Sequence, residues 1–301
     1  MANTAERPIL IVGATGQVAR ALIERAARHG VAVVAHGRPV LDLEKPAGLG
    51  SAIVDIRPAA IINAAAYTAV DKAESEPERA FAINRDGAAA LARAAAVLDV
   101  PFVHISTDYV YDGDKPAPYV EDDPTAPAGV YGRSKLEGEA AVRAAWGKTI
   151  VLRTAWVYSP FGNNFVKTML RLASERDRLR VVADQVGSPT SALDIAEAIL
   201  AILPKLEPDR PEAWAGTYHL AGGGEASWCD LARATLEVAA HHGRRAVPVD
   251  AITTADYPTP ARRPANSRLD TTRLAETFGV RLPPWRDSLE QTVARLVAGA
   301  G

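Results

Sequence analysis

Short apolar runs alternate with longer helical patterns through the first half of the chain, and this alternation constrains the fold more than any other feature. The runs predicted as strands lie at 9–12, 31–35, 60–63, 102–105 and 150–152. The patterns typical of helices lie between them, at about 16–28, 77–98 and 131–145. Strands joined by connections long enough for a helix form a parallel, doubly wound sheet, which binds ligands beyond the carboxyl ends of its strands.

The second half of the chain is less regular and predicts a smaller lobe with returning elements. Segments rich in proline and glycine at 203–211, 222–224 and 257–260 accompany helical patterns at about 192–203, 228–240 and 287–297. Together the two halves predict an α/β fold: a Rossmann-like doubly wound parallel sheet with a smaller α/β substrate-binding lobe.

Composition and charge exclude several classes of function. The 34 Lys and Arg residues nearly balance 36 Asp and Glu residues, and a formal net charge of −2 does not favour a nucleic-acid partner. A single cysteine, Cys229, excludes an intrachain disulfide and a zinc site of several cysteines. No stretch reaches the roughly 18 apolar residues of a membrane span, and no apolar segment precedes the first strand as in a signal peptide. We therefore expect a cytoplasmic protein without a membrane partner.

A glycine-rich turn joins the first predicted strand to the first predicted helix. Its sequence is Gly13-Ala14-Thr15-Gly16-Gln17-Val18-Ala19. Glycine here permits a tight turn and a close backbone approach to a pyrophosphate, and the helix N-terminus supplies N–H groups and partial positive charge. Ala19 stands at the third glycine position, where alanine is tolerated. The turn predicts a dinucleotide site at Gly13, Thr15, Gly16, Gln17 and Val18.

The residues after the second strand indicate which dinucleotide is bound. They are His36-Gly37-Arg38, without the acidic residue that binds the ribose 2′-hydroxyl of NAD. Arg38 can instead meet a 2′-phosphate, although a solvated loop charge is the alternative. We therefore predict NADPH as the cofactor, with NADH as the second choice.

Three side chains form a candidate catalytic group. Tyr131 and Lys135 are four residues apart in a predicted helix and share a face, and Thr107 follows the fourth strand. A tyrosine can protonate a ketone oxygen during hydride transfer if a neighbouring ammonium lowers its pKa toward neutrality. A threonine hydroxyl can hydrogen-bond the developing alkoxide. The group predicts a ketone reductase, and a surface helix pair is the alternative for Tyr131 and Lys135.

Longer blocks of sequence resemble the dTDP-4-dehydrorhamnose reductases, a family of the extended short-chain dehydrogenase/reductases. The most specific blocks contain Val70-Asp71-Lys72-Ala73-Glu74 and Gly162-Asn163-Asn164-Phe165. Further blocks lie at 13–18, 63–69, 106–110, 131–136, 153–158, 184–190 and 263–267, so the resemblance covers nearly the whole chain. It implies NAD(P)H-dependent reduction of the C4 ketone of dTDP-6-deoxy-L-lyxo-4-hexulose (dTDP-4-dehydro-L-rhamnose) to dTDP-L-rhamnose.

The resemblance implies roles for individual residues. Tyr131 would donate the proton, and Lys135 would tune it and anchor the cofactor ribose. Positions implied at the phosphates and the adenine are Gly16, Gln17, Val18, Asp42 and Leu43. Positions implied along the nicotinamide path are Ala66, Tyr67, Thr68 and Ile105. Positions implied at the sugar nucleotide are Thr107, Asp108, Trp156, Asn163, Asn164 and Arg263. A core aromatic is the alternative for Trp156, and a structural salt bridge is the alternative for Arg263.

One departure from the family concerns a metal. Some members form a magnesium-bridged dimer through carboxylates, and the matching positions here are Ala21, Leu193 and Arg295. None of these can give a carboxylate oxygen to a hard cation. We therefore predict no Mg²⁺ and a monomer or weak dimer without a metal bridge.

Lobe boundaries and rival functions complete these expectations. Residues 1–157 and 186–224 are assigned to the NAD(P)-binding Rossmann domain, and 158–185 and 225–301 to an interleaved sugar-nucleotide-binding lobe. The nearest alternative function is reduction of another nucleotide-linked 4-ketosugar. A more distant one is a non-catalytic NADP-binding regulatory subunit, like the β subunit of methionine adenosyltransferase.

Overall fold

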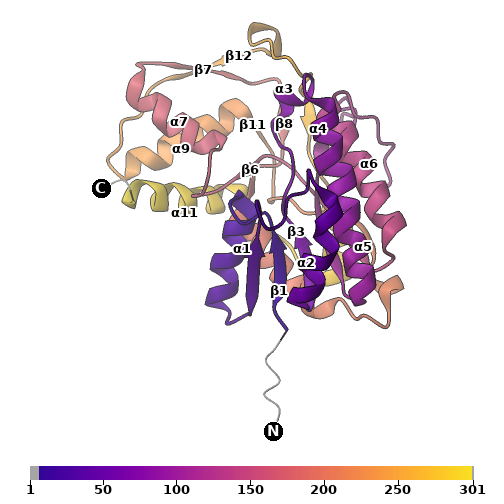
Figure 1. Ribbon diagram of the computed structural model, residues 1–301. Coiled ribbons are helices and arrows are strands. Elements are labelled where there is room, and N and C mark those ends of the chain that lie inside the picture. The colour runs from indigo at the N-terminus through magenta and orange to yellow at the C-terminus, as the bar shows by residue number, and fades with distance from the viewer. Residues whose placement is uncertain (1–6, 300–301) are drawn as a thin grey trace.

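A six-stranded sheet with only parallel pairings forms the centre of the protein (Figure 1). The computed structural model describes residues 7–299, so the expectation about a signal peptide falls largely on residues outside the described range. In spatial order the strands are β2 (Val33–His36), β1 (Ile9–Val12), β3 (Ala60–Asn63), β4 (Phe102–Thr107), β5 (Thr149–Thr154) and β10 (Gly216–His219). The chain order reverses between β1 and β3, which is where a doubly wound sheet opens a crevice for a ligand.

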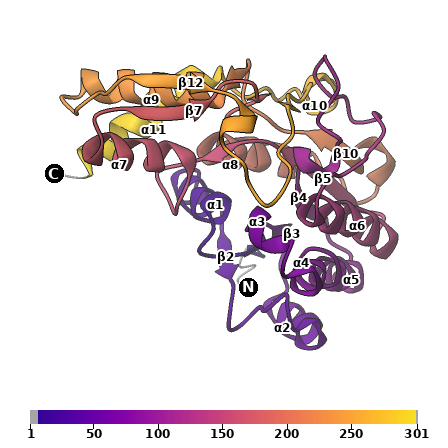
Figure 2. The same ribbon diagram turned by 90° about the horizontal axis from the view of Figure 1, so that it is seen from above.

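Helices cover both faces of this sheet, as a sheet of buried apolar strands requires. One face carries α1 (Gln17–Arg28) and α8 (Ala192–Ile202), which share an apolar core with β1, β3, β4 and β5. The other face carries α2 (Leu49–Ile56), α5 (Ala88–Leu98) and α6 (Val130–Ala145), as Figure 1 and Figure 2 show. The predicted fold class is therefore confirmed. Within residues 7–299, no helix combines the length and the hydropathy that crossing a bilayer requires.

A smaller lobe stands beside the carboxyl ends of the strands (Figure 2). Its helices α7 (Phe165–Glu175), α9 (Trp228–His241) and α11 (Trp285–Ala298) pack together beside the paired strands β7 (Leu179–Val182) and β12 (Val249–Ile252). The short strands β8 (Val186–Gly187), β11 (Ala226–Ser227) and β13 (Asn266–Ser267) form a second small sheet. Helix α10 (Thr272–Phe278) instead contributes Leu274 and Phe278 to the core under the main sheet. The predicted division into two lobes stays a prediction.

The long helix predicted at 77–98 contains a break. It consists of α4 (Pro77–Phe81), a π-helical segment (Ala82–Gly87) and α5. Asn84, in the π-helical segment, is buried and donates through its amide to the carbonyl of Tyr67 (3.1 Å) and the hydroxyl of Ser134 (2.9 Å). Widened turns of this kind are frequent at functional sites, and this one joins α6 to the loop after β3.

Several elements were not predicted. They are the helices α2, α7 and α10, the short helix α3 (Val70–Ala73), and all strands after β5, which include β6 (Val157–Tyr158) and β9 (Thr190–Ser191). The predicted strands and helices are present, with ends that differ by a few residues. Strand β4, for example, continues past Ile105 to Thr107, so Thr107 ends the strand instead of following it.

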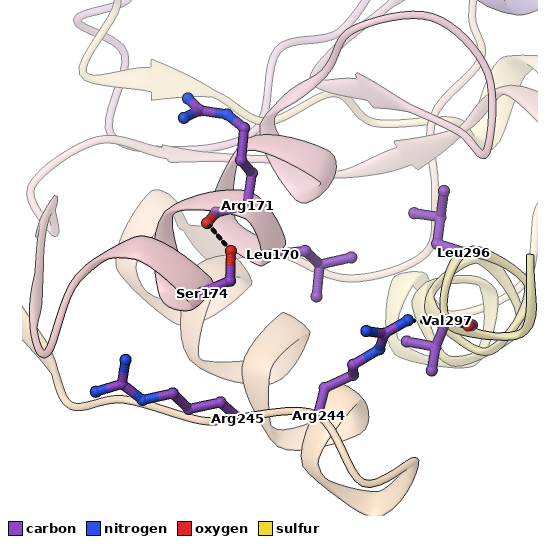
Figure 3. A pocket seen from close by; sticks show the side chains of 7 residues that line it. All are labelled: Leu170, Arg171, Ser174, Arg244, Arg245, Leu296 and Val297. Atoms are coloured by element: carbon purple, nitrogen blue, oxygen red, sulfur yellow. Dashed lines mark hydrogen bonds between the residues drawn. The ribbon is translucent and has the colours of Figure 1, made fainter. Parts of the chain in front are cut away.

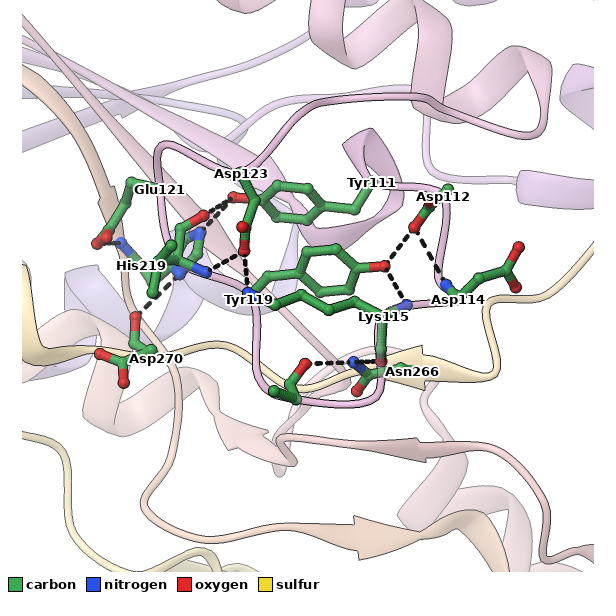
Figure 4. A network of polar contacts seen from close by, with 12 residues as sticks. Tyr111, Asp112, Asp114, Lys115, Tyr119, Glu121, Asp123, His219, Asn266 and Asp270 are labelled. Atoms are coloured by element: carbon green, nitrogen blue, oxygen red, sulfur yellow. Dashed lines mark hydrogen bonds and ion pairs between the residues drawn. The ribbon is translucent and has the colours of Figure 1, made fainter.

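A polar network connects the loop after β4 to β13 and the residues that follow it (Figure 4). Asn266 donates through its amide to the carbonyls of Lys115 (2.7 Å) and Ala117 (2.8 Å). Tyr111 stacks on Tyr119 with 4.2 Å between ring centroids. The network therefore holds the loop after β4 against the smaller lobe.

Candidate active site

A cavity of about 880 Å³ opens at the carboxyl ends of the strands, beside the reversal between β1 and β3. Its wall comes from the turns after β1, β2 and β3, the ends of β4 and β5, the start of α6 and the start of α9. Most residues predicted at the site line it: Gly13, Thr15, Gly16, Gln17, Val18, Arg38, Asp42, Leu43, Ala66, Thr68, Ile105, Thr107, Asp108, Tyr131, Lys135, Trp156 and Asn163. Segments distant in sequence therefore build one continuous surface.

The glycine turn forms a cradle of backbone groups, and its first residue lies too close to the loop after β3 to carry a side chain. Gly13 has φ +105°, and a Cβ there would lie 2.9 Å from the backbone nitrogen of Ala65. Gly16 is the N-cap of α1, and no side chain caps the first N–H groups of that helix. These groups and the positive end of the helix dipole face the cavity through Gly16, Gln17 and Val18. The cradle fits a diphosphate.

The end of the cavity beside β2 is lined by Arg38, Asp42 and Leu43. Gly37 and Arg38 directly follow β2, and neither is acidic. Asp42 lies farther along the loop, and its carboxylate accepts from the backbone N–H of Glu44 (3.1 Å). A guanidinium directly after β2, in place of an acidic residue, fits a 2′-phosphate better than a free 2′-hydroxyl.

The candidate catalytic group lies midway along the cavity. Helix α6 begins at Val130, whose N–H donates to the carboxylate of Glu74 (2.8 Å), and this bond fixes the first turn that carries Tyr131. One turn later Lys135 donates through Nζ to the carbonyl of Ile105 on β4 (2.6 Å). Thr107 donates through Oγ1 to a carboxylate oxygen of Asp108 (3.0 Å). The structure thus brings the three predicted side chains to one wall.

Burial dominates the electrostatics of this group. It raises the pKa of Tyr131 to about 12, although the neighbouring Thr107 acts in the opposite direction. It also lowers the pKa of Lys135 to about 8 and raises the pKa of Asp108 to about 6. Lys135 is not among the groups that shift the pKa of Tyr131 in this structure, so the expectation that it lowers this pKa toward neutrality stays a prediction. Tyr131 is a firmly protonated group, which suits a proton donor.

Aromatic side chains form the end of the cavity beside the smaller lobe. Trp156 follows β5 with φ +48°, and its ring stacks on Trp228 of α9 with 3.6 Å between centroids. A Cβ on Gly187 would lie 2.5 Å from the Trp156 ring, so glycine is required beside it. Trp228 was not predicted because nothing in its local sequence distinguishes it from a core aromatic.

Two buried oxygens in this wall have no hydrogen-bond partner among the described residues. They are Oδ2 of Asp108 and Oγ1 of Thr154, the last residue of β5. A buried polar atom without a hydrogen-bond partner destabilises the fold, so each of these oxygens is a site where a ligand hydroxyl could form a hydrogen bond. Thr154 could have been predicted, because it ends a parallel strand where ligands bind.

Three predicted residues do not line the cavity. Tyr67 is buried, and its hydroxyl donates to Glu76 (2.8 Å). Asn164 is the N-cap of α7 and donates to the amide oxygen of Gln17 (3.0 Å), so it positions a cavity residue instead of reaching the ligand itself. Arg263 forms an ion pair with Asp71 (2.6 Å), which corresponds to the salt bridge considered as its alternative.

A second, smaller hollow of about 230 Å³ lies between α7, the end of α9 and α11 (Figure 3). Arg171, Arg244 and Arg245 line it with apolar neighbours. Arg171 pairs with Glu175 (2.9 Å), and Arg245 pairs with Asp177. Its wall holds no acid–base pair, so the larger cavity is the candidate active site.

The positions matched to the magnesium ligands of some family members hold no carboxylate. Ala21 and Leu193 are buried, and Arg295 forms two hydrogen bonds to Glu24 (2.8 and 2.6 Å). Across residues 7–299 no group of three or more His, Cys, Asp or Glu side chains is placed to hold a metal. The prediction that Mg²⁺ has no role stays a prediction.

Comparisons with known proteins agree with this geometry. The family model described as RmlD substrate binding domain matches residues 7–298. A dTDP-4-dehydrorhamnose reductase of Sinorhizobium fredii (strain NBRC 101917 / NGR234) is 52% identical over 289 residues, which cover 96% of this chain and 97% of that protein.

Two solved structures have the same fold. A dTDP-4-dehydrorhamnose reductase from Clostridium acetobutylicum ATCC 824 has a TM-score of 0.89 and 38% identity, and covers 96% of this chain and 99% of its own. The one from Bacillus anthracis str. Ames, in complex with NADP, has a TM-score of 0.89, 34% identity and the same coverage of 96% and 99%. The chain therefore belongs to the dTDP-4-dehydrorhamnose reductase family.

Proposed function

We propose that this chain is an NADPH-dependent reductase of dTDP-6-deoxy-L-lyxo-4-hexulose, with dTDP-L-rhamnose as the product. The observation that carries the proposal is the meeting of Thr107, Tyr131 and Lys135 on one wall of a cavity that begins at a glycine cradle. The family membership and the 52% identity to a named reductase support the same reaction. NADPH is preferred over NADH because Arg38 follows β2 where an NAD-binding protein places an acidic residue.

The side chains have distinct tasks in the reduction. NADPH, when bound, supplies the hydride that C4 receives. Tyr131 gives its proton to the carbonyl oxygen, and its raised pKa does not prevent this because the developing alkoxide is a stronger base than phenolate. Thr107 stabilises the same oxygen by hydrogen bonding. Lys135 is fixed by the Ile105 carbonyl one turn from Tyr131, and we assign it the anchoring of the cofactor ribose.

The remaining site residues are proposed as binding residues. The cofactor would be held by Gly13, Thr15, Gly16, Gln17, Val18, Arg38, Asp42, Leu43, Ala66, Thr68 and Ile105, all in the wall. The sugar nucleotide would meet Asp108, Trp156 and Asn163, and also Thr154 and Trp228, which the sequence did not indicate. Tyr67, Asn164 and Arg263 support the site through neighbouring residues.

An NADPH-oxidation assay tests this function. The dTDP-linked 4-ketosugar is generated in situ by the upstream dehydratase and epimerase, and GDP- and UDP-linked 4-ketosugars serve as matched competitors. We expect turnover with the dTDP sugar and a lower kcat/KM with the others. Faster turnover of a GDP or UDP sugar would favour the alternative reductase. Tight NADP binding without turnover of any ketosugar would favour the non-catalytic regulatory protein.

We also propose a cytoplasmic monomer or weak dimer, divided into a Rossmann domain (1–157, 186–224) and a smaller lobe (158–185, 225–301). The support for the absence of a metal bridge is the pairing of Arg295 with Glu24 beside the buried Ala21 and Leu193. Light scattering with and without EDTA tests the oligomeric state. A dimer that dissociates in the chelator would contradict the proposal.

A further inference from the structure

A histidine inside the sheet contacts the catalytic lysine, and the proposed mechanism does not use it. His104 lies on β4 and is fully buried, in register with Asn63 on the neighbouring strand β3. Its Nδ1 is 3.1 Å from the amide nitrogen of Asn63, and its Nε2 is 3.5 Å from Nζ of Lys135. The imidazole therefore bridges β3 and α6 directly beneath the cavity.

The hydrogen bonds of Asn63 determine which ring nitrogen of His104 carries the proton. The amide oxygen of Asn63 accepts from the backbone N–H of Ala65 (3.1 Å), so that oxygen must face Ala65. The amide NH₂ group then faces His104 and donates to Nδ1, which must be the acceptor. Burial lowers the pKa of His104 well below its ordinary value, so the ring is neutral. A neutral imidazole that accepts at Nδ1 carries its proton on Nε2.

We propose that His104 is a positioning residue for the reduction: held by Asn63 in the Nε2–H tautomer, it presents an N–H to Lys135 and favours the neutral amine. The ammonium form of lysine can only donate hydrogen bonds, so it cannot pair with the N–H of His104. The neutral amine has a lone pair and can accept a hydrogen bond from that N–H. The same array ties Lys135 to Ala65, whose loop lines the cavity. The catalytic part of this inference rests on the proposed function, whereas the tautomer of His104 follows from the hydrogen bonds alone.

Other charged groups around Lys135 act with or against His104. Glu139, buried one turn further along α6, favours the ammonium, but Arg153 of β5 binds both of its carboxylate oxygens (2.9 and 2.7 Å). Arg143 of α6 disfavours charge on His104 itself. Charged groups of the other elements packed on α6 have partners other than Lys135. They are Glu74 directly after α3, Arg79 of α4, Arg85 of the π-helical segment and Asp108 after β4. Among residues 7–299, the side chain within hydrogen-bond distance of Nζ is that of His104.

The consequence concerns the pH range of the enzyme. Burial lowers the pKa of Lys135 to about 8, and an opposing N–H from His104 would act in the same direction. A lysine of ordinary pKa would still be charged at that pH. Exchanging the tautomer of His104 should therefore move the pH at which Lys135 changes charge.

The first test reads the tautomer directly. Long-range nitrogen–proton NMR on protein labelled with ¹⁵N-histidine, with His104 assigned by its loss in H104L, should show the proton on Nε2 at neutral and mildly alkaline pH. A proton on Nδ1 would overturn the proposal. This measurement needs neither substrate nor cofactor, so it also stands if the proposed function fails.

The second test changes the tautomer through Asn63. In N63D the carboxylate still accepts from Ala65 but can only accept from His104, so the proton moves to Nδ1 and Nε2 becomes an acceptor for the ammonium. The proton affinity of Lys135, measured by titration of its ¹³Cε chemical shift, should then be at least tenfold higher than in the parent. The limb of the kcat–pH profile that reports Lys135 should move to higher pH by the same amount. In N63D/H104L the increase over H104L should be much smaller. An equal increase in both backgrounds would show that the carboxylate acts by charge alone and would overturn the proposal.

Discussion

Gly138 of α6 offers the sharpest test of what positions the catalytic helix. A Cβ at this position would lie 2.1 Å from the backbone oxygen of Asn84 and 3.1 Å from its carbonyl carbon. Both atoms belong to the π-helical segment, so no flexible side chain can move aside. Gly138→Ala must therefore separate α6 from this segment by about 1 Å to restore ordinary contact.

The energies of this substitution oppose one another. Alanine in a helix interior gains about 1 kcal/mol over glycine. Overpacking against fixed backbone costs about 1–3 kcal/mol, so we expect a net loss of up to about 2 kcal/mol. The shift also strains the Asn84–Ser134 hydrogen bond (2.9 Å) and moves Tyr131 and Lys135, and a displacement of about 1 Å at a catalytic group can cost about 100-fold in turnover.

A matched variant separates packing from helix propensity. Gly50 lies in α2, and a Cβ there meets nothing within 4 Å, so Gly50→Ala should stabilise the protein by up to about 1 kcal/mol without loss of activity. Urea unfolding followed by circular dichroism gives the stabilities, and NADPH oxidation gives kcat/KM. If G138A proves as stable as G50A and keeps its turnover within about twofold of the parent, the close approach does not position α6.

Three further predictions concern single side chains. Tyr131→Phe should lower kcat at least about 100-fold while NADP binding and Tm stay near the parent values, and full activity would refute Tyr131 as the proton donor. Glu139→Gln leaves Arg153 as an uncompensated buried charge and should destabilise by about 3–5 kcal/mol in urea unfolding. Glu175→Gln, at an exposed pair, should cost less than about 1 kcal/mol, so equal losses in the two variants would contradict the reasoning. The pKa of Asp108 is raised to about 6 by burial, so its protonation stabilises the fold below that pH. Asp108→Asn should therefore be more stable than the parent at neutral pH and lose that advantage as the pH falls through about 6 to about 4, which unfolding curves across this range will check.

Local pattern accounts for the parts of the site that were predicted. The apolar run of β1 predicts a buried strand, and the glycines after it predict a tight turn. The first helix begins directly after this turn. Tyr131 and Lys135 share a face because four residues make about one helical turn. The carboxyl-end rule placed Thr107 beside them, although the strand ends at Thr107 and not two residues before it.

Long-range pairing accounts for the parts that were missed. Trp228 enters the wall because α9 packs beside the end of β5, which no local pattern records. Arg263 and Asn164 have side chains that could bind a ligand. In the fold Arg263 instead pairs with Asp71, and Asn164 donates to Gln17. Helix α7 and strand β10 lie in a region of irregular pattern, where tertiary contacts decide the conformation.

By itself the sequence determined the doubly wound sheet, the glycine cradle and the pairing of Tyr131 with Lys135 on one helix face, because each depends on residues that are neighbours along one strand or helix. The tertiary structure alone decided the protonation chemistry. Burial raises the pKa of Tyr131 and lowers that of Lys135, and His104 reaches the lysine from another element. Desolvation and hydrogen bonding depend on which atoms surround a group in space, and that arrangement exists only after the strands and helices have packed.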